Sequence, residues 1–157
     1  MRGGVVAADR KKWSKAIGCF TDALSLLGES LTFISEVCDV RRKRARAYIR
    51  RGWAADAELA LRDCDMVLAH SPAGARTDTE MLRLKCLKQL ALWDAASAAC
   101  TAFRETHGTS EKLSKIEAAV QRGAAHRARL RLQQEMAEAE EEEEDDDDDD
   151  EGMAGEG

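Results

Sequence analysis

The strongest constraint on the fold comes from residues 60–72, where apolar side chains recur at helical spacing in a helix predicted over residues 56–69 and a proline ends the pattern. One face of this predicted helix carries Leu59, Ala60, Cys64, Val67 and Leu68. Arg62, Asp63 and Asp65 are expected to point away from that face. Because Pro72 prevents continuation, the helix is short and cannot bury its apolar face alone. The pattern therefore requires helices stacked before and after it.

Similar patterns predict those further helices. They cover residues 13–27, about 34–51, about 78–92, 93–105, and a long segment from 111 into the acidic end, with a weaker short helix at 3–10. Gly28 and Gly52 are predicted to stop two of them. The predicted amino-terminal caps are Ser30 or Ser35, Asp78 or Thr79, and Ser110. Alanine and leucine dominate and β-branched runs are few, which indicates an all-α fold.

Charge is segregated along the chain. The formal net charge is −6, but all 24 lysines and arginines precede Met136, and only 16 acids accompany them in residues 1–137. That part therefore carries about +8, whereas residues 138–157 hold the other 14 acids and no base. Such a segment lacks the apolar content that folding requires. We predict a basic body followed by a disordered acidic tail at 138–157.

The cysteines and histidines show no pattern of a metal or catalytic site. The chain has five cysteines, an odd number, without a CxxC pair. They lie singly on apolar faces and are predicted to be buried free thiols: Cys19, Cys38, Cys64, Cys86 and Cys100. The three histidines (His70, His107 and His126) have no nucleophile beside them, and no glycine-rich phosphate loop occurs. We expect no enzymatic activity, no cofactor and no metal.

Neither a signal peptide nor a membrane span is indicated. The first twelve residues contain only a short apolar run, and no segment approaches the roughly 18 apolar residues that a spanning helix needs. We therefore expect a cytoplasmic protein, with the nucleus as the alternative location.

Three of the predicted helices align with one another. Trp13-x-x-Ala16-x-x-x-Phe20 matches Trp93-x-x-Ala96-x-x-x-Cys100, and Ala60-x-x-x-Cys64 fits both, with anchor alanines 44 and 36 residues apart. Paired helices repeating with a period near 34 resemble tetratricopeptide (TPR) repeats. Asp63-Cys64, followed by Leu68 and Pro72, resembles the second helix of repeats in TPR co-chaperones. The sequence RARAY at 44–48, followed by Gly52, resembles their first helix.

This resemblance implies an α-α superhelix of about three repeats over residues 3–106, divided as 3–28, 34–72 and 76–106. A capping or projecting helix at 110–137 and the disordered tail at 138–157 follow. The layout is closest to the TPR array of J-domain/TPR co-chaperones, although no His-Pro-Asp of a J domain occurs. The first repeat is short at its start, so a fragment of a longer co-chaperone of this kind is one alternative.

In TPR proteins the first helices of successive repeats line a concave groove. The best-known ligand of the family is the carboxyl-terminal EEVD of heat-shock chaperones, held by a clamp of Lys, Asn and Arg. Four clamp positions fall on Val5, Lys43, Asp78 and Leu82, and none of these matches. The resemblance therefore argues against EEVD binding by a carboxylate clamp.

The remaining feature of the expected groove is its positive charge. One predicted helix carries seven cations, namely Arg41, Arg42, Lys43, Arg44, Arg46, Arg50 and Arg51. As residues that contact a partner we select Arg41, Arg42, Arg44, Arg46, Tyr48, Arg83 and Lys85. Such a surface favours an acidic peptide. It lacks the interleaved aromatic residues that stack on bases, which argues against nucleic acid. We predict a protein-interaction adaptor in chaperone-related work.

The acidic tail leaves three interpretations open. It could be a solubilising extension, or it could compete intramolecularly for the basic groove. It could also hold basic clients such as histones or ribosomal proteins, with the helical repeats as a platform. The last interpretation is the alternative function of the chain, an acidic-tailed chaperone.

Overall fold

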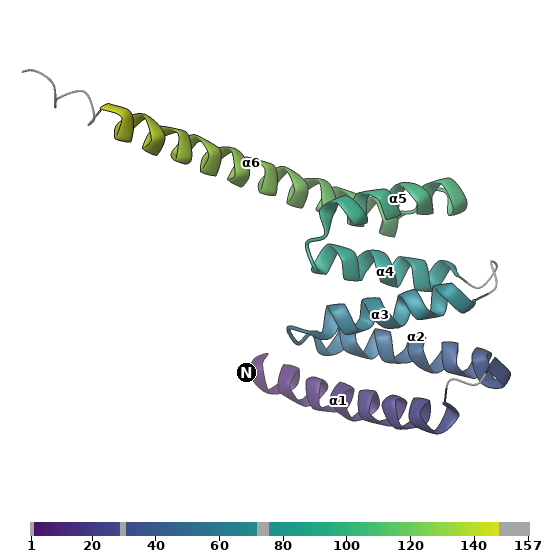
Figure 1. The fold of residues 1–157 in the computed structure, drawn as a ribbon. Helices are drawn as coiled ribbons and strands as arrows, with labels where there is room; N and C mark the ends of the chain where they lie inside the picture. Colours follow the sequence, from purple (N-terminus) through teal and green to yellow (C-terminus); the bar gives the residue numbers. More distant parts are fainter. Residues whose placement is uncertain (1, 29–30, 72–75, 148–157) are drawn as a thin grey trace, which may run out of the picture.

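The chain is a stack of helices. The computed structural model describes residues 2–28, 31–71 and 76–147, and these contain helices and no strand. In order they are α1 (Arg2–Leu27), the single 3-10 turn η1 (Leu31–Phe33), α2 (Ile34–Arg51), α3 (Asp56–His70), α4 (Thr77–Gln89), α5 (Trp93–His107) and α6 (Glu111–Asp147). Figure 1 shows α1 to α5 lying one above another, with α6 extending beyond them. The predicted all-helical class is confirmed.

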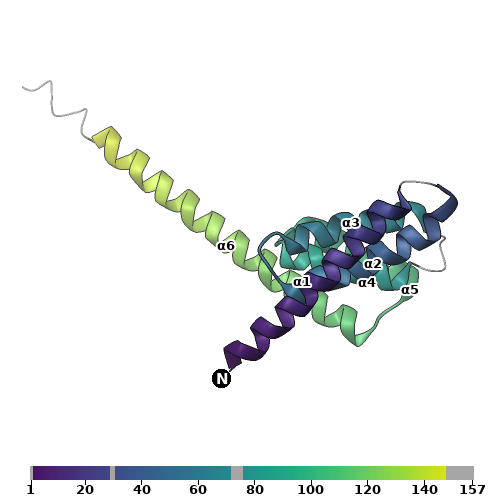
Figure 2. The same cartoon turned by 90° about the horizontal axis from the view of Figure 1, so that it is seen from below.

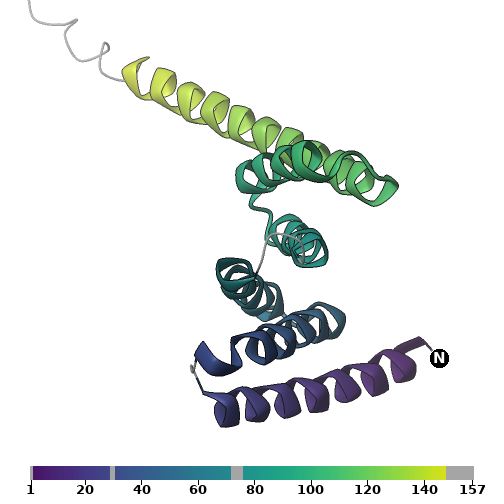
Figure 3. The ribbon, with the colours of Figure 1, turned by 90° about the vertical axis from the view of Figure 1, so that its right-hand side faces the viewer.

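The helices pack in two layers. Each helix contacts the next one along the chain, and in addition α2 contacts α4 and α4 contacts α6. Helices α2, α4 and α6 therefore form one layer, and α1, α3 and α5 lie on its other side. Figure 3 shows this alternation as a zigzag path rising from α1 to α6. Figure 2 shows the distal part of α6 leaving the stack.

Two apolar clusters hold the stack together, and α4 contributes to both. The first joins α1 to α4 and contains Ile17, Ala45, Ala47, Tyr48, Ala60, Cys64, Leu82 and Cys86. The second joins α4, α5 and α6 and contains Leu84, Leu87, Ala96, Cys100, Phe103, Leu113, Ile116 and Val120. Ala45, Ala60 and Ala96 are completely buried, as expected where small side chains let two helices approach closely.

Several predicted helix ends are confirmed. Gly28 and Gly52 follow α1 and α2 with φ angles of 64° and 70°, a conformation that favours glycine. The N–H of Gly52 donates to the carbonyl of Tyr48 at 3.0 Å, which closes the last turn of α2. At the start of α6, the Ser110 hydroxyl accepts a hydrogen bond from the N–H of Leu113 at 3.2 Å, as its predicted capping role requires.

Other predicted ends are wrong. Residues 3–10 and 13–27 belong to one continuous helix, α1, so residues 3–28 do not form the pair of helices expected of a first repeat. Ser35 lies inside α2, because the turn η1 leads directly into that helix without a side-chain cap. Asp78 and Thr79 lie inside α4, which starts at Thr77 and ends at Gln89 instead of reaching residue 92. The alternative cap, Ser30, lies outside the described residues.

Helix α6 runs into the acidic segment, as the pattern from residue 111 predicts, and passes the predicted boundary at residue 137. It continues to Asp147, so residues 138–147 are helical rather than disordered. Alanine and glutamate are both strong helix formers, and the helix of residues 111–137 leads into this segment without a glycine or proline at the junction. Residues 148–157, the remainder of the predicted tail, lie outside the described residues.

The cysteines divide into two groups. Cys38, Cys64, Cys86 and Cys100 are buried free thiols, as predicted, whereas Cys19 is exposed on α1. The hydrogen bond with Cys86, together with burial, raises the pKa of Cys64 above its usual range. The prediction fails for Cys19 because α1 has a neighbour on one side, α2, and this side chain points elsewhere. Across the described ranges, no helix combines the length and apolar character needed to cross a membrane.

Candidate functional site

An open hollow with a volume of about 240 Å³ lies between α2, α4 and the first turn of α6. We call it the basic groove. Its lining residues are Arg46, Ile49, Arg50, Asp78, Met81, Leu82, Lys85 and Lys112. The three helices belong to the same layer, so the first turn of α6 lines the groove together with α2 and α4.

The basic groove combines an apolar floor with a cationic rim. Leu82 is buried and Ile49 and Met81 are half-buried, whereas the four cations at the rim are exposed: Arg46, Arg50, Lys85 and Lys112. Among the described residues, Asp78 is the one acidic residue of the lining, and it lies 3.6 Å from the guanidinium of Arg46. Both partners are more than half exposed, so this ion pair is weak and can open for a ligand.

Two of the seven predicted contact residues, Arg46 and Lys85, line the basic groove. Arg50 also lines it and belongs to the cationic helix that the sequence singled out. Lys112 is not among the predicted contact residues, because residues 110–137 are expected to form a capping or projecting helix and not a wall of the groove. The helix that follows α5 packs in the layer of α2 and α4, so a cation in its first turn, such as Lys112, lies beside the groove.

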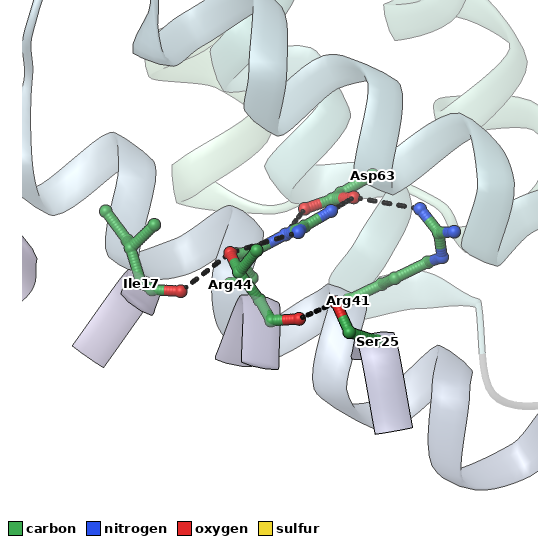
Figure 4. A network of polar contacts seen from close by, with 6 residues as sticks. Ile17, Ser25, Arg41, Arg44 and Asp63 are labelled. Carbon is green, nitrogen blue, oxygen red and sulfur yellow. Dashed lines mark hydrogen bonds and ion pairs between the residues drawn. The ribbon is translucent and has the colours of Figure 1, made fainter. Parts of the chain in front are cut away.

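Arg41 and Arg44 lie elsewhere and bind Asp63 of α3. Arg44 donates two hydrogen bonds to this carboxylate, Nε to Oδ2 and Nη2 to Oδ1, each at 2.7 Å. Arg41 donates a third at 3.2 Å, and Arg44 also reaches the hydroxyl of Thr21 on α1 at 3.3 Å. Figure 4 shows both guanidiniums converging on the carboxylate. Asp63 is only 1% exposed, so the prediction that it points away from the apolar face is wrong.

Arg51 forms a second bridge of the same kind, two helical turns away. It donates to both oxygens of Asp56, from Nη2 at 2.6 Å and from Nε at 2.9 Å, and to the hydroxyl of Ser14 at 3.3 Å. In each bridge an α1 hydroxyl, an α2 arginine and an α3 aspartate meet. Corresponding members are seven residues apart in all three helices, for example Arg44 and Arg51. We call the two sets the Arg–Asp bridges.

Electrostatics strengthens the Arg–Asp bridges. The pKa of Arg44 is raised chiefly by its hydrogen bond to Asp63, and the pKa of Arg51 chiefly by its hydrogen bond to Asp56. Burial alone would raise the pKa of Asp56, but bonds from Arg51 and from the N–H of Trp53 outweigh it and hold that pKa below its usual value. These charges bind each other, so they serve stability rather than a ligand.

The other three predicted contact residues also lie outside the lining of the basic groove. Tyr48 is buried, with Arg44 and Arg51 stacked 5.9 and 5.6 Å from its ring centre. Arg42 pairs with Asp39 on its own helix. Arg83 binds Asp65 of α3 at 2.7 Å, because residues 83 and 85 are two apart and face different sides of α4.

Comparison with protein-family models, with curated proteins and with solved structures found no match to this chain. The likeness to TPR repeats therefore depends on the residues and helix packing described above.

Proposed function

We propose that this chain is a TPR-type adaptor that binds an acidic peptide segment of a partner protein in the basic groove. The alternation of α2, α4 and α6 in one layer supports the repeat interpretation, since first helices of successive repeats would line one concave face. Chaperone-related work in the cytoplasm or nucleus belongs to the same proposal.

The observation that carries the proposal is the convergence of four exposed cations on an apolar floor. Arg46 and Arg50 come from α2, Lys85 from α4 and Lys112 from α6, so the folded stack brings together charges far apart in the chain. A peptide with acidic and apolar side chains would pair its charges with the rim and place its apolar groups on Leu82 and its neighbours.

The geometry argues against the acidic tail of the same chain as the occupant. From Lys112 to Asp147 the helix is about 52 Å long at about 1.5 Å per residue. The acidic run continues to Glu151, and these four further residues span at most about 14 Å when fully extended. Intramolecular competition for the basic groove would therefore require α6 to break.

The test is fluorescence anisotropy with a labelled synthetic peptide that alternates glutamate and leucine. We expect the wild type to bind it, and added salt to weaken binding through screening. The variant Arg50→Glu/Lys85→Glu reverses two positive charges at the rim. Its affinity for the peptide should therefore fall at least about tenfold, or about 1.4 kcal/mol.

Arg62→Glu is the matched control, because Arg62 is an exposed cation on α3, outside the basic groove. It should bind the peptide as the wild type does. Equal affinity of the wild type and the Arg50→Glu/Lys85→Glu variant would refute the proposal, and so would an equal loss in the Arg62→Glu variant.

The second candidate is the acidic-tailed chaperone for basic clients. It is favoured by α6, which carries nine acids in residues 138–147 away from the stack. Deletion of 138–157 should abolish capture of a basic probe such as a histone and leave binding of the glutamate–leucine peptide unchanged. The adaptor proposal requires that binding of the glutamate–leucine peptide is unchanged. It does not require that capture of the basic probe is lost.

A further inference from the structure

The distal half of α6 is a helix that nothing else in the described chain covers. Residues 125–142 are all exposed, including Leu130, Leu132 and Met136 at 52%, 57% and 57%. In proteins most of the stability of a helix comes from packing an apolar face against a neighbour. This segment contains apolar side chains suited to such packing, but no other helix of the described residues packs against them.

The apolar side chains lie along one stripe. Spacings of three and four residues place on the same face Ala125, Ala128, Leu132, Met136 and Ala139. Where α6 leaves the stack, Ala128 and Leu132 also line a hollow with Trp93 of α5. A second helix laid along the stripe would therefore begin at a hollow that offers both apolar and charged side chains.

The charges along the same segment are polarised. Residues 122–131 contain four arginines and no acid, whereas residues 138–147 contain nine acids and no base. Acids near the carboxyl end of a helix oppose its dipole, and like charges four residues apart repel. The acidic segment is thus a helix whose own charges work against it unless cations lie beside it.

We propose that α6 pairs antiparallel with α6 of a second copy of this chain. A pair centred between Gln134 and Glu135 brings the basic segment 122–131 of each copy level with the acidic segment 138–147 of the other. The two-fold symmetry forms every charge contact twice, as in an isologous dimer. A parallel pair would place like charges together and is disfavoured.

The flanking charges fit this register. At about 100° per residue, Arg129 and Glu140 lie on one flank of the stripe, and Arg131 and Glu138 lie on the other. In an antiparallel pair, each flank of the stripe on one copy faces the same flank of the stripe on the other copy. Arg129 is then level with Glu140 of the second copy, and Arg131 is level with Glu138 of the second copy. Both contacts join opposite charges.

Sedimentation equilibrium of the full chain over a range of concentrations tests the pairing. The wild type should be a monomer–dimer mixture at low salt and shift toward monomer in about 0.5 M salt, where charges are screened. Arg129→Glu/Arg131→Glu and Glu138→Arg/Glu140→Arg should each be monomeric, because each opposes like charges. A wild type that stays monomeric at every concentration would overturn the proposal.

Mixing the two variants gives the sharper result. In the mixed pair every reversed residue faces a residue of opposite charge, so dimers should return although neither variant associates alone. Failure of the mixture to associate would refute the register. Far-UV circular dichroism checks that both variants remain helical, and the substituted residues are exposed and outside the two apolar clusters.

A groove variant separates this dimer from the proposed peptide binding. Lys85→Glu/Lys112→Glu should dimerise like the wild type, because the paired segment begins ten residues after Lys112. If that variant is monomeric while the α6 variants still associate, the acidic segment docks in the basic groove of a second copy, and the helix pairing is wrong. Peptide binding by a strictly monomeric chain would leave the proposed function intact and reject only this inference.

Discussion

Replacing Asp63 by asparagine tests whether the Arg–Asp bridges hold α1, α2 and α3 together. Asparagine keeps the size of the side chain but removes the charge that accepts three hydrogen bonds, at 2.7, 2.7 and 3.2 Å. One acceptor oxygen remains, so Arg41 and Arg44 lose most of their hydrogen bonds to residue 63. The substitution leaves no cavity. Tyr48, stacked against Arg44, would lose part of its support as well.

The expected cost follows from burial. Removing one partner of a buried ion pair typically costs 3–5 kcal/mol. Here the carboxylate side chain is 2% exposed, but Arg41 and Arg44 are 20% and 16% exposed and regain some contact with water. We therefore expect about 3 kcal/mol, which is a large share of the 5–15 kcal/mol that usually stabilises a folded domain.

Urea unfolding followed by far-UV circular dichroism gives the free energy of unfolding by linear extrapolation. Asp65→Asn is the matched control on the same helix, since Asp65 pairs with Arg83 but is 53% exposed. Its loss should not exceed about 1 kcal/mol. Similar losses in the two variants, or a loss below about 1 kcal/mol for Asp63→Asn, would refute the argument that burial makes the bridge important.

Two further predictions concern the helix contacts. Gly18→Ala should stabilise the protein by about 0.5–1 kcal/mol, because a Cβ there meets open space and alanine favours a helix. Gly123→Ala should instead destabilise it by about 1–2 kcal/mol in the same urea assay, since the added Cβ would overlap the indole ring of Trp93; a gain in stability would show that α6 and α5 are loosely packed. The depressed pKa of Asp56 predicts that its contribution is complete above the pKa of the unfolded chain, about 3.9, and is lost as the pH falls through the lower folded value. Acid titration should therefore show that the stability difference between wild type and Asp56→Asn shrinks below about pH 4, whereas a constant difference would contradict the assigned ion pair with Arg51.

Helix identity and most helix ends could be predicted from the sequence because they depend on local features. The spacing of Ala60, Cys64 and Val67 defines an apolar face wherever the helix packs. Gly28 and Gly52 stop helices because the left-handed conformation suits glycine. The Ser110 cap likewise acts on the N–H of Leu113, three residues away. Helix faces and helix ends depend on residues that are close in sequence, so they can be predicted without knowledge of the rest of the fold.

Which partner each charged side chain contacts could not be predicted in the same way. Seven cations on one helix suggested a single binding surface, yet Arg41, Arg44 and Arg51 turn toward buried aspartates while Arg46 and Arg50 turn toward the basic groove. Side chains three residues apart share a face and those two apart do not, but which face meets α3 depends on how the helices cross.

By itself, the sequence determined that this chain is helical, that its body is basic and its end acidic, and where most helices start and stop. Only the tertiary structure decided that Asp63 is buried between two arginines and that Lys112 completes the groove. The physical reason is that helix formation depends on neighbours along the chain, whereas burial and charge pairing depend on neighbours in space. Arg44 and Asp63, which are 19 residues apart in sequence, meet only after α2 and α3 have packed.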